Sequence, residues 1–317
     1  MRDYHAHEIG NVAVLGHSGC GKTSIVETMA YRAGAIGQIG DIQSGNTISD
    51  YSAEEIARQS SINLSIVPIE WDNCKINLID VPGTFDFVGE TEAALSVCES
   101  ALIICPSYAG ISAGTKQAMY KARNKGKIIY INGLDNPNSD YPTKLQQLKD
   151  TYGKGIAPIQ VPIMDNNKMV GYVNVAKMEG RMFENGQTHE APIPEDMMDE
   201  VLPIKAMIDE AVANTSDELL EKYLEEEPFT KEEISNALRQ GVTDGSLIPV
   251  LCGTDRIGIS IILNSMCAFF DSANHPKNAL IVKDLKKDDE KILECNEDSP
   301  TSLFVFKTIT DPFVGKT

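Results

Sequence analysis

Short, uninterrupted apolar runs alternate along the chain with stretches of helical periodicity, the pattern of strands that helices cover on both faces. The first run lies at 11–15, and the apolar residues after it share one helical face and stop before Gly34. Later runs lie at 101–105, 127–131 and 250–252. A helical stretch at 112–125 separates the first two of these later runs. This order predicts an α/β fold with a doubly wound sheet and a ligand at the carboxyl ends of its strands.

A hairpin is predicted between the first run and the second. Residues 62–66 alternate apolar and polar side chains, and residues 74–80 do so until their apolar end. Asp72-Asn73 lies between them and suits a tight turn. We therefore expect two antiparallel strands that lead into residue 80.

A phosphate-binding loop follows the first apolar run. The residues Gly16-His17-Ser18-Gly19-Cys20-Gly21-Lys22-Thr23 fit the pattern G-x-x-x-x-G-K-[ST], and Ser24 continues into the helix. Glycines let successive backbone N–H groups point at phosphate oxygens, and the helix adds partial positive charge. Lys22 can reach the β- and γ-phosphates, and the Thr23 hydroxyl can ligate Mg²⁺.

Cys20 has two interpretations. A helix N-terminus can lower the pKa of a thiol and make it reactive. A small side chain can also simply fit a tight loop. We favour packing.

The second candidate element is Asp80-Val81-Pro82-Gly83, which has the form D-x-x-G of GTPases. Its aspartate holds Mg²⁺, usually through water, and the N–H of its glycine senses the γ-phosphate. The pattern is weak by itself, but here it ends the predicted hairpin downstream of a phosphate loop.

Asn132-Gly133-Leu134-Asp135 follows the run at 127–131 and resembles the N-K-x-D guanine clamp. The Asp135 carboxylate can accept both N–H donors on the guanine edge, which adenine lacks. Gly133 stands where the clamp has a lysine whose stem packs over the base, so weaker base affinity is expected. Gly253-Thr254, after the run at 250–252, is predicted to be the last base-side loop.

The composition of the chain limits the classes of partner that the protein is expected to bind. The chain of 317 residues has 46 acidic and 28 basic residues and a formal net charge of −18, which disfavours a broad nucleic-acid face and free DNA. No stretch stays apolar for the ~18 residues of a membrane span, and we expect a cytoplasmic protein without a membrane partner. The seven cysteines are scattered, which predicts reduced, mostly buried thiols.

The motifs in this order resemble elongation factor G and its paralogues. Residues 11–17 look like the first strand and phosphate loop of that family, and residues 76–83 with Asp86-Phe87 look like its second switch. The interval between the two base-side loops is too long for one crossover. Its segments at 177–178, 193–195, 217–224 and 232–239 look like the G′ insertion, and those at 303–308 and 311–316 look like the opening of the β-barrel domain.

The resemblance implies a domain plan. Residues 1–155 and 246–282 would form a discontinuous GTP-binding domain, a P-loop GTPase sheet. Residues 156–245 would form an inserted α+β G′ subdomain. Residues 283–317 would form a linker and the truncated start of a β-barrel domain, which indicates a fragment.

The resemblance also implies the chemistry. It predicts a GTPase that binds GTP or GDP with Mg²⁺, with Thr23, Ser61 and Asp80 around the metal and Lys22, Gly83 and residue 84 at the reacting phosphate. The partner would be the ribosome, at the large-subunit factor site and the stalk, and the protein would promote translocation or remodelling as a monomer.

The sequence departs from the family at this nucleotide site. The family has a histidine directly after D-x-P-G, where it positions the attacking water, and this chain has Thr84. In the first switch, Gln59 replaces glycine and Ser61 replaces the metal-ligating threonine; Gly19 replaces an aspartate of the phosphate loop. Loss of a water-positioning group can cost orders of magnitude in rate.

Three functions stay open. The chain is a ribosome-stimulated GTPase, a GTP-binding ribosomal switch with little or no hydrolysis, or a ribosomal-protection factor. Individual departures such as Gly133 or Gln59 can also be neutral drift, and Thr84 is the main reason to expect slow hydrolysis.

The insertion is acidic, with a run at Glu225-Glu226-Glu227 that is either a solvated helix face or a docking surface. Apolar residues from Leu202 to Val212 have helical spacing and are expected to pack on the GTP-binding domain. The charged segment Lys283–Glu297 is expected to be a linker.

Overall fold

The computed structural model describes residues 2–184, 187–275, 279–284, 289–295, 299, 301–311 and 315–316. Within these residues, apolar runs form a central sheet of seven strands. The strands are β1 (Ile9–Gly16), β2 (Ser65–Trp71), β3 (Cys74–Asp80), β4 (Ser100–Pro106), β5 (Gly126–Asn132), β6 (Ile156–Pro158) and β11 (Ile248–Cys252). Their order across the sheet is β2-β3-β1-β4-β5-β11-β6.

All neighbouring pairs in this sheet are parallel except β2 with β3. The parallel strands β1, β4 and β5 lie in the centre, and every residue of β4 and β5 is buried. Parallel strands need cover on both faces, which explains their uninterrupted apolar sequences. The carboxyl ends of β1, β4 and β5 therefore meet at one edge of the sheet, where the glycine-rich loops follow.

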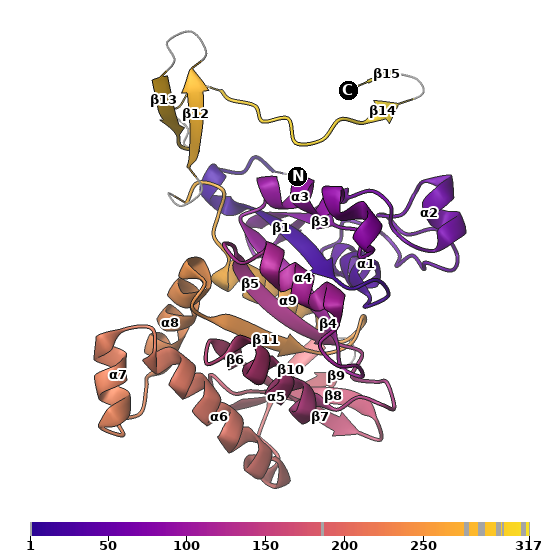
Figure 1. The fold of residues 1–317 in the computed structure, drawn as a ribbon. Coiled ribbons are helices and arrows are strands. Elements are labelled where there is room, and N and C mark those ends of the chain that lie inside the picture. Colours follow the sequence, from indigo (N-terminus) through magenta and orange to yellow (C-terminus); the bar gives the residue numbers. More distant parts are fainter. Residues whose placement is uncertain are drawn as a thin grey trace.

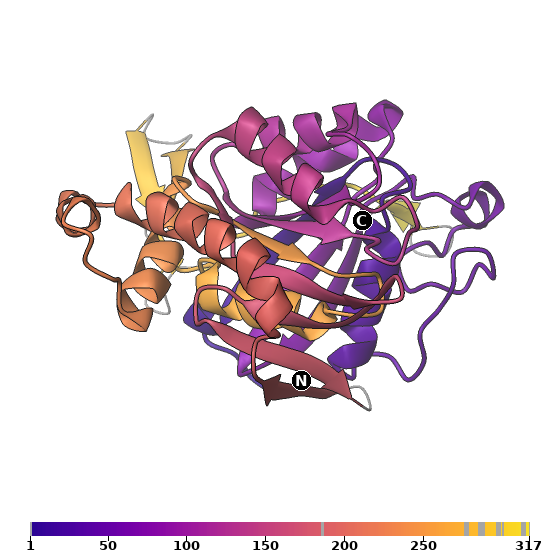
Figure 2. The same ribbon diagram turned by 90° about the horizontal axis from the view of Figure 1, so that it is seen from below.

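Helices cover both faces of the sheet, as Figures 1 and 2 show. One face carries α1 (Lys22–Arg32), α8 (Lys231–Asp244) and α9 (Ile259–Phe269), which contact one another through α9. The other face carries α3 (Val88–Val97), α4 (Ala113–Lys121) and α5 (Tyr141–Tyr152). The short helix α2 (Ala53–Arg58) lies in the connection between α1 and β2. This arrangement confirms the predicted doubly wound α/β sheet.

The inserted part is α+β, as predicted. Strands β7 (Gln160–Asp165), β8 (Lys168–Asn174), β9 (Glu179–Glu184) and β10 (Gln187–Ala191) form an antiparallel sheet in the order β10-β9-β8-β7. Helices α6 (Met198–Ala213) and α7 (Asp217–Leu224) follow. Ile156–Pro158, at the start of the predicted insertion, is β6 and closes the edge of the central sheet beside β11.

Several local expectations about the insertion are refined by the structure. Helix α6 packs against β6 with Val201, Ile204 and Ile208 buried, whereas Leu202, predicted on the packed face, is 53% exposed. The glutamates at 225–227 are exposed and follow the end of α7 instead of forming a helix face.

The predicted first hairpin is confirmed with a shifted start. Asp72 and Asn73 both have positive φ, of 43° and 63°, as a tight turn of this kind requires. The prediction that residues 62–64 begin the strand was wrong. The backbone N–H groups of Ile62 and Asn63 donate to the Glu55 carboxylate at 3.0 Å, and that of Leu64 donates to Glu90, so they do not join the sheet.

The predicted linker Lys283–Glu297 contains regular structure. In its described part and just before it, β12 (Leu280–Asp284) and β13 (Asp289–Leu293) form an antiparallel hairpin, and its role as a linker stays a prediction. Residues 303–308 are not a strand, because no neighbouring segment in the described chain pairs with them. The small hairpin β14 (Thr310–Asp311) with β15 (Gly315–Lys316) follows; residues 312–314 lie outside the described residues. A barrel domain stays a prediction.

No helix among the described residues is long and apolar enough to cross a membrane. None of the cysteines forms a disulfide in this part of the chain, and most are buried, as predicted. The remaining 3-10 helices are Ala6–Glu8, Phe85–Phe87 and Glu195–Met197.

Candidate functional site

The phosphate loop connects the end of β1 to the start of α1. Gly19 and Gly21 have φ of 74° and 94°, a left-handed conformation that side chains rarely adopt. Gly21 is the N-cap of α1, so the helix begins at Lys22, with Thr23 and Ser24 in its first turn. The backbone conformation of the loop therefore requires glycine at these two positions.

The base-side strand is tied to this loop. The Asn132 side chain donates from Nδ2 to the backbone oxygen of Cys20 at 2.9 Å. A Cβ on Gly21 would lie 2.5 Å from the same nitrogen, so only glycine leaves room for this contact. Asn132 thus fixes the phosphate loop against the carboxyl end of β5.

The three candidate metal-ligating residues lie together. The Thr23 hydroxyl donates to Asp80 Oδ2 at 2.8 Å, and Thr23 Oγ1 lies 3.3 Å from Ser61 Oγ. All three side chains are buried. They come from the start of α1, the end of β3 and the connection before β2, and the fold brings them to one point.

Asp50 is a fourth member of this group, and the sequence reasoning missed it. Its carboxylate is buried, beside the Ser61 hydroxyl. Burial raises its pKa, whereas the Ser61 hydroxyl and the positive charge of Lys22 lower it. No motif marks Asp50, because it reaches the site from an irregular segment and not from a strand end.

Burial also raises the pKa of Asp80 to about 6, although the positive charge of Lys22 and the hydrogen bond from Thr23 lower it. Asp80 Oδ1 has no hydrogen-bond partner within the described chain. Desolvated carboxylate oxygens of this kind favour a nearby cation. Together with two hydroxyls they form an all-oxygen donor set, which is what Mg²⁺ prefers, so the residues present fit a magnesium ion.

The second switch rests on the phosphate loop. Val81 and Pro82 are buried. A Cβ on Gly83 would lie 2.7 Å from the backbone nitrogen of Ser18 and 2.8 Å from the backbone carbon of His17. The Lys22 ammonium donates to the backbone oxygen of His17 at 3.0 Å. The candidate residues for phosphate recognition are therefore in direct contact.

Thr84 lies next to this contact and is half-buried. It lines a small cavity with Gly16, Gly83 and Thr91, at the end of β1. The ring of Phe85, one residue further, lies 6.3 Å from the ring of His17, measured between centroids. A larger side chain at position 84 would enter the cavity between the second switch and the phosphate loop.

The base-side residues surround a cavity of about 310 Å³. Its lining includes Gly19, Cys20, Gly21, Asn132, Gly133, Asp135, Asn136 and Asp255, together with Tyr108. Leu134 and Thr254 are buried beneath it: the N–H of Leu134 donates to the Gly253 carbonyl at 3.1 Å, and the Tyr130 hydroxyl donates to the Thr254 carbonyl at 2.7 Å. The cavity therefore joins both predicted base-side loops to the phosphate loop.

Tyr108 is the second site residue that the sequence reasoning missed. Gly133 has φ of 81°, and a Cβ there would lie 3.2 Å from Tyr108 Cε1. The preceding Ser107 donates from its hydroxyl to the Gly133 carbonyl at 2.6 Å. The aromatic ring thus lies where the lysine of an N-K-x-D clamp would start, and it comes from the end of β4.

Cys20 is 4% exposed, and burial raises the pKa of its thiol despite the nearby Lys22. A raised pKa opposes thiolate formation. The packing interpretation of Cys20 is the one that these observations support.

Comparison with known proteins decides the family. The family model of the elongation factor Tu GTP binding domain matches residues 7–272. The chain belongs to this family. A solved structure of a protein from Thermus thermophilus is similar over 98% of the chain, with a TM-score of 0.83 and 29% sequence identity. The chain spans 44% of the length of that protein.

Membership in the elongation factor Tu GTP-binding domain family establishes a translational type of GTPase domain that binds guanine nucleotides.

Two buried glutamates hold the segment before β2. Glu27 of α1 accepts from the N–H groups of Gly40 and Ile48 at 2.8 Å, and Glu55 of α2 accepts from those of Ile62 and Asn63. Ser61 is therefore positioned by backbone contacts on its carboxyl side.

Proposed function

We propose that this chain is the nucleotide-binding part of a translational GTPase of the elongation factor G type. It would bind GTP with Mg²⁺, act at the factor site and stalk of the large ribosomal subunit, and promote translocation or remodelling as a cytoplasmic monomer. The motif order and the α+β insertion between the base-side loops support the elongation factor G type.

One observation carries the nucleotide part of this proposal. Thr23, Ser61 and Asp80 meet at the start of α1, beside Lys22 and close to the buried carboxylate of Asp50. Taking two carboxylates out of water is costly, and a divalent cation would offset that cost. The cluster lies where the phosphates of a nucleotide on this loop would end.

The roles of the remaining residues follow from their positions. The N–H groups of the phosphate loop and the Lys22 ammonium would neutralise phosphate oxygens, and Gly83 would contact the γ-phosphate through its backbone. Mg²⁺ would supply charge neutralisation at those oxygens. Asp135 would accept the two N–H donors of guanine in the base-side cavity, with Tyr108 as one wall.

Thr84 supports a second candidate, a GTP-binding ribosomal switch with little or no hydrolysis. A threonine hydroxyl can hold a water but has no imidazole to orient it. Thr84 lines a small cavity together with Gly83 and Gly16, so a side chain at this position lies next to the phosphate loop. A ribosomal-protection factor is a third form of the same proposal, and no contact among the described residues favours it.

Single-turnover GTP hydrolysis by the protein, with and without ribosomes, tests the proposal beside Thr84→His. The matched control is Thr91→His, which adds the same imidazole to the same cavity from α3. GTP binding with slow hydrolysis that Thr84→His raises, and Thr91→His does not, would establish the slow switch. Strong ribosome stimulation of the unmodified protein would establish the active enzyme instead. Failure to bind guanine nucleotides would refute the proposal.

A further inference from the structure

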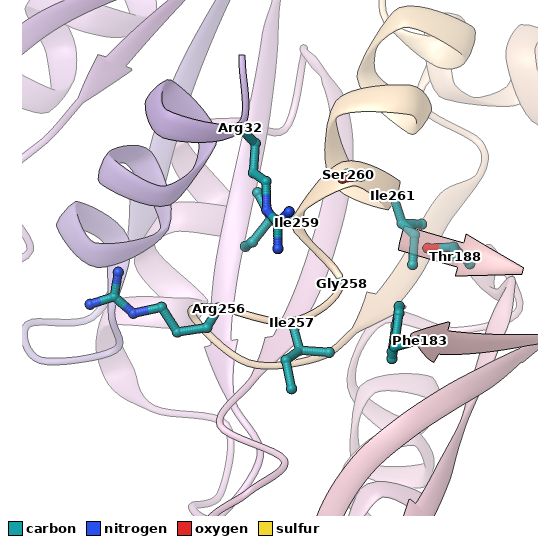
Figure 3. A pocket seen from close by; sticks show the side chains of 9 residues that line it. All are labelled: Arg32, Phe183, Thr188, Arg256, Ile257, Gly258, Ile259, Ser260 and Ile261. Atoms are coloured by element: carbon teal, nitrogen blue, oxygen red, sulfur yellow. The ribbon is translucent and has the colours of Figure 1, made fainter. Parts of the chain in front are cut away.

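A third cavity, of about 220 Å³, lies away from the phosphate loop and is shown in Figure 3. Three segments enclose it: the end of α1, the loop from β11 into α9, and the strands β9 and β10 of the insertion. The residues that matter for its chemistry are Arg32, Phe183, Thr188, Arg256, Ile257 and Ile261. We propose that this cavity binds a small organic anion with an apolar body, and that its occupant changes the rate at which nucleotide leaves the neighbouring site.

The walls have two distinct characters. Ile257, Ile261 and Phe183 supply apolar surface, and Phe183 and Ile261 lie together on the side of the insertion (Figure 3). Arg32 extends from the end of α1 toward Ile259 on the other side (Figure 3). A ligand that fills the cavity would thus meet a guanidinium at one end and aliphatic and aromatic carbons at the other, and guanidinium groups bind carboxylates and phosphates in two-pronged geometry.

The charge of the site contrasts with that of the chain. The protein carries a net charge of −18, yet two arginines line this one cavity. The second, Arg256, extends toward α1 and away from Phe183 and Ile261 (Figure 3), with Nη1 3.5 Å from Thr28 Oγ1 and Nε 3.9 Å from Asp255. A ligand with one compact anionic group fits this contrast, whereas the net negative charge of the chain disfavours a long polyanion.

The size of the cavity favours a small molecule over a protein segment. Sites for drug-sized ligands usually enclose about 300–1,000 Å³, and this one is smaller. Its lining comes from three sides instead of following one helix or strand, so it does not form an extended groove for a peptide.

Hydrogen bonds connect the cavity to the base-side loop. The N–H groups of Arg256 and Ile257 donate to Thr254 Oγ1 at 3.1 and 2.9 Å, and the N–H of Thr254 donates to the Ile257 carbonyl at 3.0 Å. A shift of residues 256–257 would therefore move Thr254 and the adjoining Gly253. The Gly253 carbonyl in turn accepts from Leu134, inside the predicted guanine clamp.

Helix α1 connects the cavity to the phosphate loop as well. It begins at Lys22 and ends at Arg32, so one rigid element carries residues of both sites. A ligand that holds Arg32 and the 256–257 turn would restrain both halves of the nucleotide site. The effect on nucleotide release rests on the proposed function, whereas binding in the cavity does not.

The binding test uses octanoate as the probe and 1-octanol as its uncharged match, with titration calorimetry on the nucleotide-free protein. Octanoate is expected to bind with a dissociation constant of about 1 mM or tighter. Arg32→Gln should weaken it roughly ten-fold or more, since a charge-assisted hydrogen bond is lost. Arg239→Gln, an exposed arginine of α8, is the control. Ile261→Trp, which fills the cavity and keeps Arg32, should also abolish binding.

Three results would overturn the site: no octanoate binding at about 10 mM, equal binding of octanol, or equal affinities of the Arg32→Gln and Arg239→Gln variants.

The coupling between the cavity and the nucleotide site is measured as the release rate of fluorescent mant-GDP with and without saturating octanoate. A several-fold change that Arg32→Gln removes is expected, and an unchanged rate would overturn the coupling. A protein that binds octanoate but not mant-GDP would refute the proposed function and leave the cavity site standing.

Discussion

Gly83 lies so close to Lys22 that a Cβ atom on residue 83 would be 2.3 Å from the lysine Nζ. The second switch therefore packs on the phosphate loop without a side chain between them. Gly89, six residues further in α3, has no atom within 4 Å of a Cβ built on it. These two glycines form a matched pair for substitution.

Gly83→Ala is expected to destabilise the nucleotide-free protein by about 1–3 kcal/mol, because the backbone atoms of His17 and Ser18 must move to admit the methyl group. Gly89→Ala is expected to stabilise it by about 0.5–1 kcal/mol, as alanine does inside a helix. Urea unfolding of both variants measures the difference. Equal stabilities would show that the switch does not rest on the loop as described.

Asp135→Asn should exchange guanine for xanthine as the preferred base. A carboxylate accepts from two N–H donors, whereas an amide presents one acceptor and one donor, which suits the extra carbonyl of xanthine. Competition of GDP and XDP for the protein measures the preference, and guanine affinity should fall about ten-fold or more. Asp255→Asn changes another carboxylate of the same cavity. If Asp255→Asn switches the base preference and Asp135→Asn does not, Asp255 and not Asp135 is the residue that recognises the base.

Tyr108→Ala should weaken mant-GDP binding by about two- to ten-fold, because an aromatic face beside the base contributes roughly 0.5–1.5 kcal/mol. The control is Tyr120→Ala, since Tyr120 is 67% exposed on α4, where its ring lies beside Arg123. Unchanged affinity in the Tyr108 variant would mean that the ring supports Gly133 without touching the base.

The pKa of Asp80 predicts how pH affects the stability of the nucleotide-free protein. Its folded value of about 6 lies above the ordinary 3.8, so the folded state holds this proton between about pH 4 and 6. The contribution of Asp80 is therefore fully present below that window and is lost as pH rises through 6. The stability of the unmodified protein relative to Asp80→Asn should fall across the window by up to about 3 kcal/mol. Parallel stability curves for the two proteins would contradict the shift.

The elements that could be predicted from sequence are those whose chemistry is local. The phosphate loop joins a buried strand to a helix within a few residues, so its glycines and Lys22 are visible together. Asp135 follows β5 directly. The buried strands themselves were also predictable, because parallel strands covered on both faces have long apolar runs.

Contacts between segments that are distant in the chain could not be predicted. Asp50 and Tyr108 reach the site only when their loops fold onto α1 and β5, and neither belongs to a motif. The start of β2 was misplaced because the carboxylates of Glu55 and Glu90 bind the backbone N–H groups of Ile62–Leu64, which the alternation of side chains does not reveal.

The short edge strand β6 joins the insertion to the central sheet. Three residue pairs, from Ile156 with Ile248 to Pro158 with Val250, join β6 to β11, and β7 begins two residues after β6. A force applied to the insertion would load this pair of parallel strands in shear. Because β11 ends just before Gly253, a displacement of the insertion would pass through β6 and β11 to the loop beside the base cavity. The insertion, although distant from the nucleotide, would thereby change the position of that loop.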